Sequence, residues 1–114
     1  MTSARWTAEI RKMQQAFPWF EPMDLGARIG FAGHLHGPNG RLHSVKIIAW
    51  KRGYPAIPPQ IFIEPRVGTN WGYDGCLCVQ RMWRPEKDTF AQQVLYAIDY
   101  LQSQRRPSER ALNL

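Results

Sequence analysis

Two cysteines, separated by one residue, carry most of the chemistry that this sequence could perform. Cys76 and Cys78 follow a glycine-rich stretch and precede an apolar helical pattern. A thiol in such a loop can act as a nucleophile, a metal ligand or a redox partner, because its thiolate form is reactive and binds soft metals. On a strand the two side chains would lie on the same face. A disulfide between them would close a small, strained ring and stabilise little, so a structural bridge is the weakest interpretation.

Two histidines raise metal binding as an alternative use of these thiols. Together with Cys76 and Cys78, His34 and His36 would supply the nitrogen and sulfur ligands that zinc prefers. Their Cys-x-Cys and His-x-His spacings differ from those of zinc fingers, and the histidines fit the solvent side of a strand. We therefore predict no metal or other cofactor, and keep a thiol redox protein as a separate alternative.

A first helix is predicted over residues 2–16. Its apolar residues recur on one helical face: Trp6, Ile10, Met13 and Phe17. Glu9 and the neighbouring polar residues are assigned to its outer faces. Pro18 and Pro22 are expected to end it, because proline supplies no backbone donor.

Three strands and a second helix are predicted after it. Residues 27–50 alternate in polarity around the turn signal Asn39-Gly40 and predict a hairpin, and residues 60–64 predict a short third strand. Residues 65–75 predict a long loop. Thr89 is the expected N-cap of a helix that fades near Gln104. The order of elements predicts an α+β fold with an antiparallel meander sheet.

The length and charge predict one basic domain. The 114 residues suit a single domain over residues 1–104 with a tail over residues 105–114. No apolar run is long enough to span a membrane and no signal-peptide pattern opens the chain, so we expect a cytoplasmic protein. The net charge of +6 fits either a solvated surface or docking to an acidic protein, whereas no basic-aromatic motif favours nucleic acid.

The order of elements and five short motifs resemble the ubiquitin-conjugating enzyme family from the first helix to about Gln104. The motifs are Tyr54-Pro55, Pro58-Pro59, Asn70, Cys78 and Trp83-Arg84-Pro85. The family carries a His-Pro-Asn triplet and a Gly-x-x-Cys-Leu segment. The corresponding positions here read Gly68-Thr69-Asn70 and Gly75-Cys76-Leu77-Cys78, and the family's asparagine-to-cysteine spacing selects Cys78 rather than Cys76.

The chain also departs from the family pattern. Gly68 and Thr69 replace the histidine and proline of the triplet, which concerns loop geometry more than chemistry. We expect the C-terminal helices of typical eukaryotic members to be absent, since the sequence ends soon after the central helix. The acidic residue that some members place later in the chain has no clear counterpart. The short chain and double cysteine are similar to homologues in bacterial operons, including those of anti-phage CBASS systems and of ubiquitin-like conjugation pathways.

The resemblance implies an enzyme that carries an acyl group as a thioester and passes it to an amine. It implies that Cys78 is the nucleophile and that Asn70 stabilises the oxyanion or organises the loop. Cys76 is a second thiol, which is either a small buried side chain, a second acyl acceptor or a redox partner. Asp74 either orients an incoming lysine or serves the turn.

The resemblance also implies partners. The residues that we expect to contact partners or substrates are Asp74, Trp83, Arg84, Arg5, Arg11 and Lys12, of which the last three form a basic face on the first helix. The expected partners are an activating enzyme or equivalent loading factor and a donor with a glycine-like C-terminal tail, either a ubiquitin-like protein or a cyclic-oligonucleotide synthase. The alternative is a non-catalytic binding module, because inactive variants and RWD domains share this fold but typically lack the cysteine.

Overall fold

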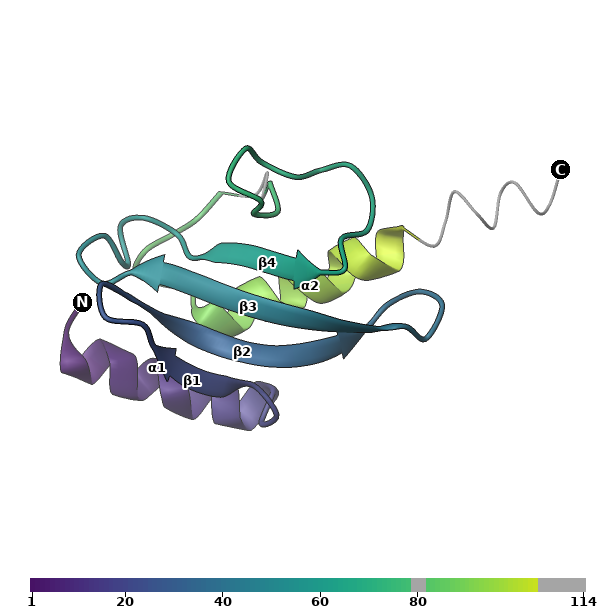
Figure 1. The fold of residues 1–114 in the computed structure, drawn as a ribbon. Helices are drawn as coiled ribbons and strands as arrows, with labels where there is room; N and C mark the ends of the chain where they lie inside the picture. The colour runs from purple at the N-terminus through teal and green to yellow at the C-terminus, as the bar shows by residue number, and fades with distance from the viewer. Residues whose placement is uncertain (79–81, 105–114) are drawn as a thin grey trace, which may run out of the picture.

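Four antiparallel strands form a sheet, and two helices cover one of its faces (Figure 1). The computed structural model describes residues 1–78 and 82–104; the predicted tail, residues 105–114, lies outside the described residues. The elements are α1 (Ser3–Ala16), β1 (Glu21–Asp24), β2 (Arg28–His36), β3 (Leu42–Trp50), β4 (Gln60–Glu64) and α2 (Phe90–Ser103). The strands follow one another in the order β1-β2-β3-β4, which confirms the predicted α+β class and meander sheet.

The structure contains one strand more than predicted. β1 pairs with β2 in antiparallel register, with Glu21 opposite Ala32 and Asp24 opposite Ile29. The prediction missed it because Pro22 argues against a strand. A proline is tolerated there because β1 is an edge strand, where one row of backbone groups has no neighbouring strand.

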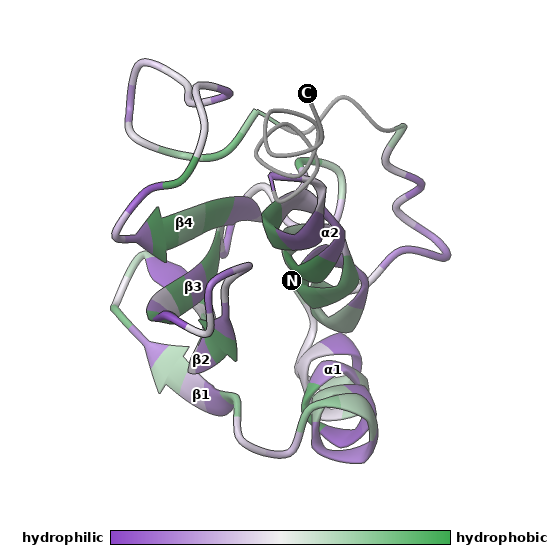
Figure 2. Cartoon of the chain, turned by 90° about the vertical axis from the view of Figure 1, so that its right-hand side faces the viewer, coloured by the Kyte–Doolittle hydropathy of each residue, from purple (hydrophilic) through white to green (hydrophobic). Residues whose placement is uncertain are grey.

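The core lies between the sheet and the helices, where the apolar stripes of both layers meet (Figure 2). Side chains from every layer are fully buried, including Met13 of α1, Ile47 of β3, Ile61 of β4 and Phe90 of α2. Each contributes about 1.5–3 kcal/mol relative to an exposed position. This burial confirms the inward face predicted for the first helix.

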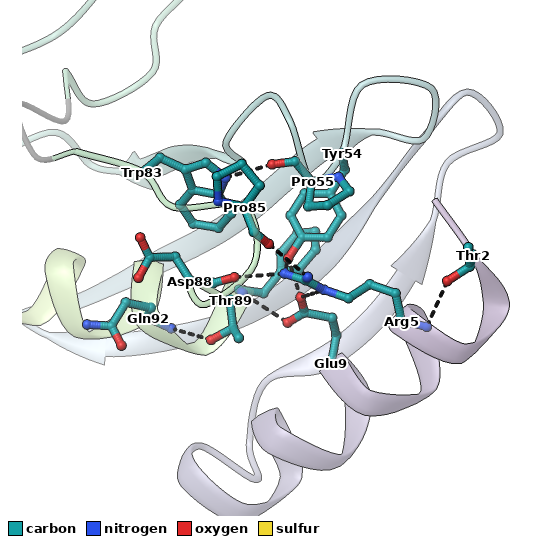
Figure 3. Close-up of polar contacts among 11 residues, drawn as sticks. Thr2, Arg5, Glu9, Tyr54, Pro55, Trp83, Pro85, Asp88, Thr89 and Gln92 are labelled. Carbon is teal, nitrogen blue, oxygen red and sulfur yellow. Dashed lines mark hydrogen bonds and ion pairs between the residues drawn. The ribbon is translucent and has the colours of Figure 1, made fainter.

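A buried carboxylate joins α1 to the rest of the molecule. The prediction that Glu9 faces outward is wrong, because its side chain is only 1% exposed. One of its oxygens, Oε2, accepts from Arg5 Nε at 2.8 Å and from the hydroxyl of Tyr54, and Oε1 accepts from the backbone N of Phe90 at 3.1 Å (Figure 3). Burying a charge costs several kcal/mol unless an opposite charge and donors compensate it. These three donors come from α1, from the loop after β3 and from the start of α2.

The guanidinium of Arg5 extends this cluster to the segment before α2. Arg5 donates to the carbonyl oxygens of Pro85 at 2.9 Å and Asp88 at 2.7 Å, and to the hydroxyl of Tyr54 at 3.0 Å. Burial and the neighbouring Glu9 raise the pKa of Tyr54, so its hydroxyl stays protonated and remains a donor. Arg5 therefore fixes the segment that precedes α2.

The predicted cap of α2 is confirmed. Thr89 lies in an extended conformation at the N-cap, and its hydroxyl oxygen accepts from the backbone N of Gln92 at 3.2 Å. This bond satisfies one of the free N–H groups of the first helical turn.

We predict that Glu9→Ala lowers the free energy of unfolding by about 3 kcal/mol, because the substitution leaves Arg5, Tyr54 and the Phe90 N–H without their acceptor. Urea denaturation followed by circular dichroism measures this. Glu9→Gln keeps acceptor oxygen and should lose about 1–2 kcal/mol. The matched control is the exposed Glu21 of β1, where Glu21→Ala should change stability by less than about 0.5 kcal/mol. Equal effects of the two alanine variants would contradict the role of the buried carboxylate.

Candidate active site

The thiol segment is anchored by the leucine between the two cysteines. Leu77 is 2% exposed, and its backbone N donates to the carbonyl oxygen of Ile61 in β4 at 2.7 Å. It also forms an isolated β-bridge with Trp71. Because side chains alternate along an extended segment, burying Leu77 turns its two neighbours toward the other side. Both cysteines line one pocket, as expected from their spacing.

Asn70 and Cys78 are held together by two reciprocal hydrogen bonds. The backbone N of Cys78 donates to the carbonyl oxygen of Asn70 at 2.9 Å, and the side-chain Nδ2 of Asn70 donates to the carbonyl oxygen of Cys78 at 2.9 Å. These two bonds connect the loop at Asn70 to the thiol segment, which is the loop-organising role considered for Asn70. An amide nitrogen carries two hydrogens, and this bond uses one of them.

The two thiols lie in different environments. The Cys78 side chain belongs to an exposed residue, whereas Cys76 is half-buried. Gln60 Nε2 lies 3.7 Å from Cys76 Sγ, and Asp74 Oδ1 accepts from the backbone N of Cys76 at 3.3 Å. Burial, with the neighbouring Asp74 carboxylate, raises the pKa of Cys76 to about 11, so this thiol is protonated at neutral pH.

The pocket beside the thiols has a volume of about 340 Å³. Its residues come from the proline-rich connector, the start of β4, the thiol segment, the segment before α2 and the first turn of α2: Pro58, Pro59, Gln60, Cys76, Leu77, Cys78, Met82, Trp83 and Gln93. Trp83 Nε1 donates to the carbonyl oxygen of Pro55 at 2.7 Å, and the buried Gln93 donates to that of Pro59 at 2.9 Å. These bonds fix the position of the pocket wall, and they give Trp83 an anchoring contact.

The structure separates the predicted partner-binding arginines and lysine. Arg11 and Lys12 are exposed on α1, and Arg84 is 54% exposed, with its guanidinium 3.7 Å from Asp88. Arg5 does not share their surface, since its guanidinium is bound within the Glu9 cluster. The placement of Arg5 on an open basic face is therefore corrected.

The suggested histidine–cysteine metal site does not assemble. Among residues 1–78 and 82–104, no three His, Cys, Asp or Glu side chains are grouped so that they could share a metal ion. His34 and His36 lie on β2, and β3 and β4 separate that strand from the thiol segment.

Within residues 1–78 and 82–104, neither helix has the length and apolar character needed to cross a membrane.

Two residues of the site, Gln60 and Gly72, could not be recognised as site residues from the sequence. Gln60 contacts both Cys76 Sγ and Asp74 Oδ2, but it resembles any polar residue at the start of a strand. Gly72 lies against Cys78 and Asp74, but glycine in a loop is ordinary. Both roles depend on contacts between separate segments.

Comparisons of the chain with protein-family models, with curated proteins and with solved structures give no match. The geometry of the thiol segment and the motifs of the sequence are therefore what point to a function.

We predict that limiting iodoacetamide at pH 8 alkylates Cys78 before Cys76, because Cys78 is exposed and Cys76, with a pKa of about 11, is almost entirely protonated. Fragmentation of the tryptic peptide that contains both residues locates the label. In Cys78→Ser the labelling rate of Cys76 should rise about tenfold per pH unit between pH 8 and pH 10, because the thiolate fraction rises in that proportion below the pKa. Equal labelling of the two thiols at pH 8 would refute this assignment.

Proposed function

We propose that this chain is a ubiquitin-conjugating-enzyme-like acyl carrier. It accepts the C-terminal acyl group of a protein donor on Cys78 as a thioester and transfers that group to an amine. The observation that supports this most directly is that Cys78 is exposed and that its backbone N and carbonyl oxygen are each hydrogen-bonded to Asn70 at 2.9 Å. A bacterial anti-phage CBASS or ubiquitin-like conjugation pathway in the cytoplasm is the setting that we infer from the motifs.

Loading requires an accessible sulfur and room for the end of the donor. The thiolate of Cys78 attacks the activated carbonyl carbon of the donor, a carbon–sulfur bond forms, and the activating group leaves. The pocket beside Cys78 offers a mainly apolar wall, to which Pro58, Pro59 and Trp83 contribute. A narrow, glycine-like tail fits beside such a wall more readily than a tail with bulky side chains.

Transfer requires stabilisation of a negative oxygen. When an amine attacks the thioester, the carbonyl oxygen becomes an oxyanion, which a positioned N–H donor stabilises. Asn70 Nδ2 carries a second hydrogen besides the one bound to Cys78 O, and it is fixed next to the reacting residue. Asn70 therefore serves both the loop and the oxyanion in this proposal, while the protonated Cys76 remains a second thiol at the site.

Partners are inferred from the surface charges. Arg11 and Lys12, exposed on α1, offer a basic surface for an activating enzyme or equivalent loading factor with an acidic face. The exposed Arg84 lies next in sequence to Trp83 of the pocket wall, and we expect it to contact the donor or acceptor protein.

We predict that a peptide ending in Gly-Gly, supplied as its 2-mercaptoethanesulfonate thioester, transfers its acyl group to Cys78. Intact mass spectrometry should show one added acyl group on the unsubstituted protein and on Cys76→Ser, and none on Cys78→Ser. Undiminished acylation of Cys78→Ser would refute the proposed nucleophile. Absence of acylation in all three proteins would favour the non-catalytic binding module.

We predict that Asn70→Ala still accepts the acyl group but discharges it to free lysine about 10²-fold more slowly, because it lacks the N–H that stabilises the oxyanion. Single-turnover decay of the purified acyl-protein measures this. Asn39→Ala, in the exposed turn between β2 and β3, is the matched control and should discharge normally. An unchanged discharge rate in Asn70→Ala would remove Asn70 from the chemical step.

A further inference from the structure

A buried glutamine faces the thiol pocket from the first turn of α2. Gln93 is 1% exposed and lines the pocket together with Cys76 and Cys78. Its Nε2 donates to the carbonyl oxygen of Pro59 at 2.9 Å. Because a carbonyl oxygen can only accept, the nitrogen of the carboxamide must face Pro59, and the oxygen Oε1 must face away from it.

The carboxamide oxygen of Gln93 has no donor opposite it. Within residues 1–78 and 82–104, the bond to Pro59 is the only hydrogen bond of this side chain. In the same part of the chain, every fully buried side-chain nitrogen or oxygen has a hydrogen-bond partner. Oε1 therefore lies on the small accessible part of Gln93, at the pocket. An acceptor among apolar neighbours favours a ligand that brings a donor, because leaving it unpaired under a ligand costs free energy.

The rest of the pocket suits a narrow and uncharged donor group. Pro58, Pro59 and Trp83 contribute apolar walls, and none of the described residues that line the pocket is Asp, Glu, Lys or Arg. Its volume of about 340 Å³ is at the lower end of the range for small ligands. An ammonium group would lose its hydration there without gaining an opposite charge. A peptide N–H is a neutral donor, so the main chain of a short peptide matches this pocket.

We propose that Gln93 is a specificity-determining residue of the thiol pocket, and that its Oε1 accepts a main-chain N–H from one of the last two residues of the donor. This inference rests on the proposed function and deepens it, because it names the donor class. The donor tail ends in two small residues, and the amide nitrogen that Gln93 recognises carries a hydrogen. A proline at that position has no such hydrogen and would be excluded.

The first test uses the unsubstituted protein and three peptides, each supplied as its 2-mercaptoethanesulfonate thioester. One peptide ends in Gly-Gly, and in the other two N-methylglycine replaces the last or the penultimate glycine, which removes one N–H and adds no charge. In each reaction the Cys78 thiolate attacks the carbonyl carbon, a new carbon–sulfur bond forms, and mercaptoethanesulfonate leaves as a thiolate.

Intact mass spectrometry measures the loading rate at limiting peptide. Each rate is divided by the rate at which the same peptide exchanges with N-acetylcysteine in solution, which corrects for intrinsic reactivity. At least one N-methylated peptide should load about three- to tenfold more slowly than the Gly-Gly peptide, as expected for the loss of one hydrogen bond.

The second test removes the acceptor. Gln93→Leu should load the Gly-Gly peptide about three- to tenfold more slowly and should load all three peptides at the same corrected rate, because no group is left to recognise the N–H. Gln93→Met repeats the test with an unbranched side chain. The matched control is Gln92→Leu on the next residue of α2, which does not line the thiol pocket and should keep the full difference between peptides. A general loss of stability slows all three peptides alike, so it does not change their ratio.

The outcomes separate this inference from the function on which it rests. If the unsubstituted protein does not acquire the acyl group on Cys78, the acyl-carrier function and the role of Gln93 both fail. If the three peptides load at equal corrected rates, the role of Gln93 is refuted and the acyl carrier stands, and this result needs no variant to fold. If the difference between peptides persists in Gln93→Leu or Gln93→Met, another group recognises the N–H, Gln93 serves only to anchor Pro59, and the inference is equally refuted.

Discussion

The arrangement of this protein depends on one buried carboxylate. Glu9 cannot be charged inside the molecule unless donors surround it, and those donors come from α1, from Tyr54 in the loop after β3 and from the first residue of α2. Arg5, which carries the compensating charge, also holds the carbonyl oxygens of Pro85 and Asp88. The segment that leads to Asp88 starts at Met82 and Trp83, which line the thiol pocket. A charge pair far from the cysteines in sequence therefore fixes one side of their surroundings.

The second constraint is the alternation of side chains around Leu77. This leucine is buried and its backbone N is hydrogen-bonded to Ile61, and the cysteines on either side of it both line the pocket. Their different contacts then give them different chemistry. Burial and the neighbouring Asp74 carboxylate raise the pKa of Cys76 and keep this thiol protonated, while Cys78 is exposed and its backbone is hydrogen-bonded to Asn70. This contrast, rather than the presence of two thiols, is what supports a single nucleophile at the site.

Periodic apolar patterns predicted both helices, β2, β3 and β4, because each buries a regular face in the shared core. The same reasoning missed β1, where Pro22 hides an edge strand, and misplaced Glu9. A carboxylate inside a helical stripe looks like a surface residue until its partners, Tyr54 and Phe90, are known, and these lie 45 and 81 positions away. At the site, the motifs selected Cys78 and Asn70. The parts played by Gln60 and Gly72 could not be predicted, because they arise where β4 and the loop meet in space.

The central claim is that Cys78 carries a protein-derived acyl group as a thioester. The most direct measurement is intact mass spectrometry of the protein recovered from its own cells, lysed in acid without reductant so that thioesters survive. The account predicts a fraction with the added mass of a second polypeptide, attached at Cys78 and released by a small thiol. An adduct at any other residue, or recovery of the protein solely with free thiols, would contradict it.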